Sequence, residues 1–125
     1  MIDHISIGVR DLVRAKVFYD AALTPLGYRC IAQNDASLGY GAETVSFWVL
    51  AADVPVPAND ASGLHICFAS PSQKSVDAFH AAALEHGGRD NGVPGLRKDY
   101  DANYYAAFVR DPDGYRIEAY CGSTL

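Results

Sequence analysis

The chain has 125 residues, half of them hydrophobic and a fifth charged. This length suits one domain whose core is large enough to be stable without disulfides. The composition excludes the disordered and fibrous classes of protein. Fifteen acidic residues against ten Lys and Arg give a net charge of −5, so no nucleic-acid partner is expected, because phosphate backbones repel a negative chain. No apolar run approaches the ~18 residues of a membrane span, so no membrane partner is expected either.

The cysteine pattern indicates a reducing compartment. Cys30, Cys67 and Cys121 are odd in number and include no CxxC pair, which is typical of reduced thiols rather than of a disulfide framework or a zinc site. The N-terminus shows no basic segment followed by an apolar stretch of the kind found in secretory leaders. A cytoplasmic protein is therefore expected.

The sequence repeats itself after an offset of 61 positions. The matching pairs are His4 and His65, Ile5 and Ile66, Phe18 and Phe79, Leu23 and Leu84, and Gly27 and Gly88. A repeat of this length that occurs only twice predicts two similar modules within one domain. The modules are expected over 1–54 and 63–125, joined by a linker over 55–62 that is rich in Pro, Asn, Asp and Ser.

Each module predicts the same order of elements. An alternating apolar segment near its start has the period of a strand, and apolar residues at three- and four-residue steps then indicate a helix. Further strand-like segments follow at roughly 29–33, 36–41, 44–51, 89–93, 103–110 and 115–121. We therefore predict an α+β fold in which two βαβββ modules form a curled mixed sheet around a cup, with the helices on the outer face.

The first strands of both modules place a histidine above a row of small residues. His4 is followed on its face by Ser6 and Gly8, and His65 by Cys67 and Ala69. Small side chains leave space above the sheet, which a curled sheet encloses as a pocket. A single strand histidine is more often a hydrogen-bonded core residue, but the equivalent placement of two of them favours a shared site.

The sequence Asp-Pro-Asp-Gly at 111–114 predicts a tight turn that brings a carboxylate to the same face. A four-residue hairpin there pairs residue 118 with 107 and residue 120 with 105. The side chains then expected on one face are Arg116, Glu118, Tyr120 and Tyr105. Two imidazoles and one carboxylate leave open positions on a divalent ion. We therefore expect His4, His65 and Glu118 to converge on iron, manganese, zinc or nickel.

Three segments carry a resemblance to a known family. Residues 1–7 (MIDHISI), 63–68 (GLHICF) and 107–118 (AFVRDPDGYRIE) resemble the vicinal oxygen chelate superfamily. That superfamily includes glyoxalase I, extradiol dioxygenases, fosfomycin-modifying thiol transferases and bleomycin-binding resistance proteins. The resemblance covers essentially the whole chain. It implies a metal cup between paired modules, with His4, His65 and Glu118 at ligand positions, and frequent pairing of chains.

One ligand position departs from the family pattern. The resemblance implies an acidic fourth ligand near Phe47, which is aromatic here. This disfavours glyoxalase I itself, whereas the surviving two-His, one-Glu set matches extradiol dioxygenases and the thiol transferases. With one negative charge fewer, the metal is expected to bind weakly enough to be lost on purification. Bleomycin-binding proteins, which use the cup without a metal, remain an alternative.

Further residues are expected to contact the substrate. Tyr105 is the candidate catalytic residue, since its phenol could donate to a metal-bound substrate oxygen. The expected substrate-binding residues are Phe47, Arg97, Tyr100, Asn103, Arg116 and Tyr120. An alternative for the loop residues among them is a solvated loop without a role in binding.

Two function classes follow from these expectations. The first is a metal-dependent enzyme, a lyase, dioxygenase or transferase whose small-molecule substrate chelates a divalent metal through neighbouring oxygens. The second is a metal-free protein that binds a small molecule. The surviving ligand set favours the enzyme. A homodimer is also expected, because the modules leave open edges that a second copy can meet.

Overall fold

The computed structural model describes residues 1–122; positions 123–125, the end of the expected second module, lie outside the described residues. The elements in chain order are β1 (Ile5–Val9), α1 (Leu12–Leu23), the short helix η1 (Thr24–Leu26), β2 (Arg29–Asn34), β3 (Ser37–Gly41), β4 (Phe47–Ala51), η2 (Asp60–Ser62), β5 (His65–Ala69), α2 (Gln73–Glu85), β6 (Arg89–Leu96), β7 (Tyr105–Arg110) and β8 (Arg116–Cys121). The order strand, helix, three strands occurs twice. The predicted α+β class with paired βαβββ modules is confirmed.

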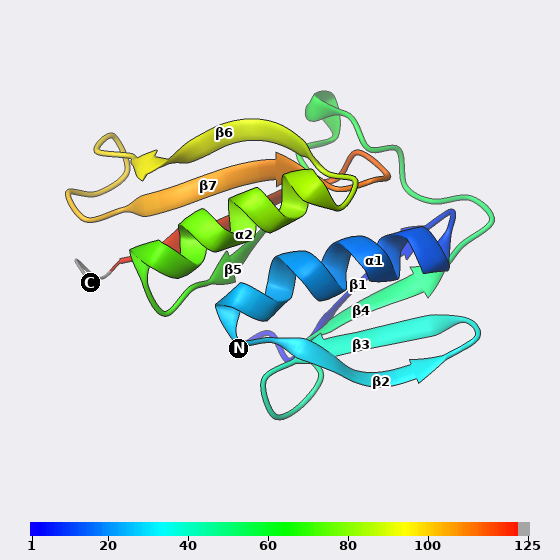
Figure 1. Cartoon of the computed structure of the whole chain (residues 1–125). Helices are drawn as coiled ribbons and strands as arrows, with labels where there is room; N and C mark the ends of the chain where they lie inside the picture. The colour runs from blue at the N-terminus through cyan, green and yellow to red at the C-terminus, as the bar shows by residue number, and fades with distance from the viewer. Residues whose placement is uncertain (123–125) are drawn as a thin grey trace.

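The strands form two four-stranded mixed sheets, ordered β1-β4-β3-β2 and β5-β8-β7-β6. In each sheet the first strand of the module pairs in parallel with its last strand, and the remaining pairs are antiparallel. Figure 1 shows α1 and α2 side by side on one side of the two sheets. The opposite faces of both sheets are left without a covering helix.

Side-chain caps fix where the two helices begin. The Asp11 carboxylate accepts a hydrogen bond from the Arg14 N–H, and the Ser72 hydroxyl accepts one from the Ser75 N–H. Each bond satisfies one of the N–H groups that a helix start leaves without a partner. After α1 and η1 the chain reverses at Gly27, whose φ of 90° is accessible to glycine at no steric cost.

The helix-facing side chains of both sheets pack with α1 and α2 into one apolar core. Its largest fully buried side chains include Phe18, Tyr19, Leu23, Leu38, Tyr40, Val49, Phe79, Val109 and Ile117. The Tyr19 hydroxyl of the first module donates to the buried Asp111 carboxylate of the second at 2.5 Å. In return, the Tyr115 hydroxyl donates to the Gly8 carbonyl at 2.9 Å. None of the helices within residues 1–122 is long and apolar enough to cross a membrane.

Candidate functional site

His65 and Glu118 form a pair on the uncovered face of the second sheet. His65 is the first residue of β5, and Glu118 lies in the middle of β8. These two strands pair in parallel. The His65 Nε2 lies 2.8 Å from the Glu118 Oε1; the His65 side chain is 37% exposed and the Glu118 side chain 2%. The imidazole of the pair is thus open to solvent, whereas the carboxylate is buried. The structure brings together two of the three predicted metal ligands.

Tyr104 holds the other oxygen of the same carboxylate. Its hydroxyl donates to the Glu118 Oε2 at 2.6 Å. Burial, together with the adjacent negative charge, raises the pKa of the Tyr104 phenol above its ordinary value, so it remains a donor at neutral pH. Both oxygens of Glu118 are thus bonded, as a buried charged group requires. This residue was not among the predicted site residues.

Aromatic rings surround this pair. The Phe108 ring lies 6.1 Å from the His65 ring at an interplanar angle of 30°, and the Tyr104 and Tyr120 rings lie 4.1 Å apart. Burial and the Glu118 carboxylate raise the pKa of the neighbouring Cys67 thiol to about 12. Cys67 is therefore a neutral thiol at physiological pH and not an activated nucleophile.

The third predicted ligand, His4, lies apart from the other two within one chain. Its Nδ1 lies 2.7 Å from the Asp3 carboxylate just before β1, and its side chain is 52% exposed. Among residues 1–122 no group of three His, Cys, Asp or Glu side chains lies close enough to hold a metal ion. The expected convergence of His4 with His65 and Glu118 is therefore absent from a single copy of the chain.

The hairpin register between β7 and β8 differs from the prediction by one residue. Phe108, not residue 107, is the partner of Glu118, and Arg110 is the partner of Arg116. Gly114 adopts a φ of 95°, and the Asp111 carboxylate accepts from the Asp113 and Tyr115 N–H groups, each at 2.9 Å. A left-handed glycine at this place adds one residue to the loop, which exchanges the faces of every side chain in β7.

This shift makes the predicted role of Tyr105 wrong. Its hydroxyl donates to the Asp77 carboxylate of α2 at 2.6 Å, on the helix side of the sheet. The neighbouring Tyr104 takes the place beside Glu118 that was expected for Tyr105. The two adjacent tyrosines were a signal in themselves, since consecutive residues point to opposite faces and either register brings one of them to the site.

The predicted place of Phe47 in the cup is also wrong. Phe47 is 4% exposed, and its ring packs edge-on against Tyr19 and Phe68 in the core, at 5.2 and 5.1 Å. The other face of β4 carries Trp48, which pairs with Ser6 in the same way that Glu118 pairs with Cys67. By the repeat, Trp48 is therefore the counterpart of Glu118 in the first module.

The remaining predicted residues lie around the loop over 97–104 or along β8. Tyr100 packs edge-on against the Tyr104 ring at 5.0 Å, whereas Asn103 is exposed and its N–H donates to the Asp101 carboxylate. Arg116 lies next to His65, where its Nε donates to the Leu64 carbonyl at 3.2 Å. Arg97 lies over Phe108, with its guanidinium carbon 5.3 Å from the ring centre.

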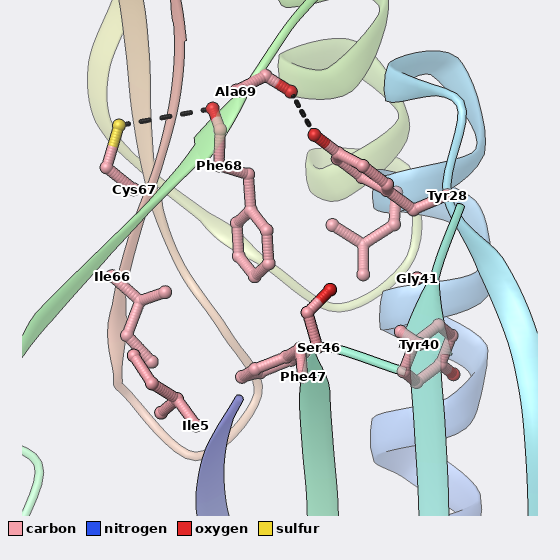
Figure 2. Close-up of a pocket in the computed structure, with 11 residues that line it drawn as sticks. Ile5, Tyr28, Tyr40, Gly41, Ser46, Phe47, Ile66, Cys67, Phe68 and Ala69 are labelled. Atoms are coloured by element: carbon pink, nitrogen blue, oxygen red, sulfur yellow. Dashed lines mark hydrogen bonds between the residues drawn. The ribbon is translucent and has the colours of Figure 1, made fainter. Parts of the chain in front are cut away.

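An apolar pocket lies between the two modules (Figure 2). It has a volume of about 200 Å³ and is lined by Ile5, Leu23, Tyr28, Tyr40, Gly41, Ser46, Phe47, Ile66, Cys67, Phe68 and Ala69. Figure 2 shows the Phe68 ring pointing toward Phe47, while the Tyr28 hydroxyl donates to the Ala69 carbonyl at 2.7 Å. Of the predicted site residues only Phe47 lines this pocket.

The paired βαβββ modules define the structural class of the chain. Residues 1–119 match the family model of the Glyoxalase/Bleomycin resistance protein/Dioxygenase superfamily. The chain belongs to this superfamily, and the resemblance inferred from its motifs is confirmed. A search of curated proteins finds no match.

Solved structures agree with this assignment. A glyoxalase/bleomycin resistance protein from Albidiferax ferrireducens T118 is 34% identical, with a TM-score of 0.83 over 94% of this chain and 95% of that one. The fold is shared with the fosfomycin resistance protein FosX from Listeria monocytogenes (16% identity, TM-score 0.70, 96% and 91% covered). It is also shared with a glyoxalase I mutant from Zea mays (21% identity, TM-score 0.69, 95% and 45% covered).

Proposed function

We propose that the protein is a metal-dependent enzyme that acts on a small molecule chelating a divalent metal through neighbouring oxygens. The reaction is of the lyase, dioxygenase or transferase type. The observation that carries this proposal is the His65–Glu118 pair, an imidazole and a buried carboxylate 2.8 Å apart on an open sheet face. Glyoxalase I activity is disfavoured, because the counterpart of Glu118 in the first module is Trp48 rather than an acid.

The donor atoms fit a divalent ion. The pair offers an imidazole nitrogen and a carboxylate oxygen, His65 Nε2 and Glu118 Oε1, 2.8 Å apart, and both are donor types that divalent first-row metals accept. The ion would be iron, manganese, zinc or nickel. When bound, it would polarise the chelating oxygens of the substrate. Tyr104 keeps the Glu118 carboxylate in place, and Phe108 and Tyr120 offer aromatic surface beside it.

The third ligand comes from a second copy of the chain in a homodimer. His4 occupies the place in the first module that His65 occupies in the second. Its Nδ1 is engaged by Asp3, which leaves Nε2 as the ring nitrogen that would bind a metal, as in carboxylate-bonded histidine ligands. Because His4 does not reach His65 and Glu118 within one chain, each complete site needs both copies. The odd number of cysteines, with no CxxC pair, is typical of reduced thiols, and on this ground we place the dimer in the cytoplasm.

Calorimetric titration with Mn²⁺ tests the ligand set. Wild-type protein is expected to bind one ion per chain, whereas Glu118→Gln, His65→Asn and His4→Asn should each lower the affinity at least about tenfold. His86→Asn is the matched control, because His86 is exposed just after the end of α2 and its Nδ1 bonds to the carbonyl of Ala82, one turn earlier. Unchanged binding in Glu118→Gln or His65→Asn would refute the site.

A mixing experiment tests the contribution of the second copy. Chains with His4→Asn and chains with Glu118→Gln, refolded together, form mixed dimers in which one of the two sites has all its wild-type ligands. About a quarter of all sites should then recover tight Mn²⁺ binding. No recovery in verified mixed dimers would show that His4 is not delivered from the partner.

The alternative function is metal-free binding of a small apolar molecule, which the pocket of about 200 Å³ between the modules favours. Its lining is mostly aromatic and aliphatic (Figure 2), as in many ligand sites. Titration with the hydrophobic dye Nile red tests it. Dye binding that Phe68→Asp abolishes, in a protein that binds none of the four metals, would favour this alternative over the enzyme.

A further inference from the structure

The loop over 97–104 places an arginine beside the His65–Glu118 pair. The Arg97 N–H donates to the Tyr104 carbonyl at 2.7 Å, so the two residues face each other at the base of this loop. From there the Tyr104 hydroxyl reaches Glu118, and the Arg97 guanidinium lies over the Phe108 ring. Phe108 is the direct strand partner of Glu118. The guanidinium therefore lies on the same sheet face as the proposed metal ligands.

Two glycines of β6 make room for this guanidinium. A Cβ at Gly92 would lie 2.9 Å from the Phe108 ring and 3.3 Å from the Arg97 Nη2, and a Cβ at Gly95 would lie 3.2 Å from the Arg97 Nη1. A Cβ at either position would force the guanidinium to shift by a few tenths of an ångström. The Nη2 also donates to the Val93 carbonyl at 2.6 Å. The guanidinium is thus held by the backbone of β6, the strand that Arg97 directly follows.

The Arg97 guanidinium is not part of any ion pair among residues 1–122. Two of the other six arginines form ion pairs with acids among the described residues: Arg110 with Asp60 at 2.8 Å and Arg14 with Asp113 at 2.9 Å. In a chain of net charge −5, a fixed and unneutralised cation next to a candidate site is a recognition group for a negative ligand.

We infer that the substrate carries an anionic group that Arg97 binds, while its neighbouring oxygens reach the metal held by His65 and Glu118. The inference rests on the proposed function for the second of these contacts. Strands β6 and β8 flank β7, and neighbouring strands lie about 5 Å apart. The carbon skeleton between the anion and the chelating oxygens would therefore lie over Phe108. Arg97 is a specificity-determining residue that selects acids over neutral chelators.

Catechol and protocatechuate are suitable probes, because they differ by one carboxylate and share the same pair of neighbouring oxygens. Their affinities are measured by calorimetry with and without Mn²⁺. Wild-type protein should bind protocatechuate about 10- to 100-fold more tightly than catechol, as a charge-assisted arginine contact provides. Arg97→Gln should remove this preference by weakening the binding of protocatechuate. Gly95→Ala should weaken the preference through displacement of the guanidinium.

Lys98→Gln is the matched control, since it removes the same charge from the same loop at an exposed neighbour and should keep the preference. Equal binding of both probes, a preference that survives in Arg97→Gln, or no protocatechuate binding with or without Mn²⁺ would each overturn the inference. If Mn²⁺ itself does not bind but the Arg97-dependent preference persists without metal, the metal-dependent function fails and the inference about the anion stands.

Discussion

The Glu118 carboxylate is buried, yet each of its oxygens has a hydrogen-bond partner, His65 on one side and Tyr104 on the other. Removal of either partner would leave a buried charged atom without compensation, which is more costly than the loss of a hydrogen bond at the surface. The pair of donors therefore explains how an acid can be kept at this depth before any metal binds. It also makes Tyr104 a positioning residue for the proposed ligand.

Tyr104→Phe tests this positioning role. The substitution keeps the ring but removes the donor to Glu118 Oε2, so we expect unfolding free energy to fall by about 1–3 kcal/mol. Mn²⁺ affinity should fall about 10-fold, because ligands lose orientation without their hydrogen-bond partners. Calorimetry and urea unfolding measure the two effects. Tyr100→Phe makes the same chemical change on the neighbouring exposed ring, and an equal loss of affinity there would contradict the role of Tyr104.

The buried Tyr19 phenol leads us to expect that the unfolding free energy of the protein falls at alkaline pH. Burial, and then the Asp111 charge, raise the pKa of this phenol well above its ordinary value. The unfolded chain therefore loses this proton first as pH rises through ~10, and the unfolding free energy falls above that pH. Tyr19→Phe should cost about 1–3 kcal/mol at pH 8, and the difference from wild type should shrink by roughly 1.4 kcal/mol per pH unit above 10. Urea unfolding at pH 8 and 11 measures it; a constant difference would refute the coupling.

At the scale of elements, the repeat and the hydrophobic periodicity were sufficient to predict two βαβββ modules, because they reflect the burial of whole faces. Helix starts at Asp11 and Ser72 were predictable from capping chemistry. By contrast, the sequence did not predict which side chains of β4 and β7 face the helices. Apart from Arg110, their side chains are apolar or aromatic on both sides, so alternation carries little information there. One extra residue in the turn at Gly114 decides the register of β7.

The separation of His4 from His65 and Glu118 has a different cause. His65 and Glu118 lie on directly paired strands of one module, so their proximity follows from local topology. His4 lies in the other module, and its distance from them depends on how the modules pack through α1 and α2, which no local pattern in the sequence encodes. The predicted ligand set was therefore recovered only within a module.

A pair of substitutions in β4 tests its register. Phe47→Glu would bury a carboxylate among Tyr19 and Phe68, and we expect it to destabilise the fold by more than about 3 kcal/mol or to prevent folding. Trp48→Glu places the acid on the open face at the counterpart of Glu118. It should fold and, if the dimer forms the proposed site, bind Mn²⁺ more tightly than wild type. Thermal unfolding and calorimetry read out both; a stable Phe47→Glu protein would contradict the assigned faces.

At the scale of the whole molecule, the two sheets differ in the character of their uncovered faces. The second presents His65, Cys67 and charged or aromatic side chains, whereas the first presents Trp48 and Leu50 beside Ser6 and Gly8. Both helices lie on one side of the two sheets (Figure 1), so within residues 1–122 no helix covers the opposite faces. A second copy that apposes the first sheet of one chain to the second sheet of the other would cover both.

Leu50→Lys tests whether the first sheet is covered in this way. Leu50 is 37% exposed in one chain, and a charge at this position would be buried in the proposed dimer without a partner. We expect light scattering at micromolar concentration to give about twice the chain mass of 13.4 kDa for wild type and a mass near that of one chain for Leu50→Lys. Val13→Lys is the matched control, because Val13 is 78% exposed on α1, away from the uncovered sheet faces. A wild-type mass of one chain would refute the dimer, and a dimeric Leu50→Lys protein would show that its interface lies elsewhere.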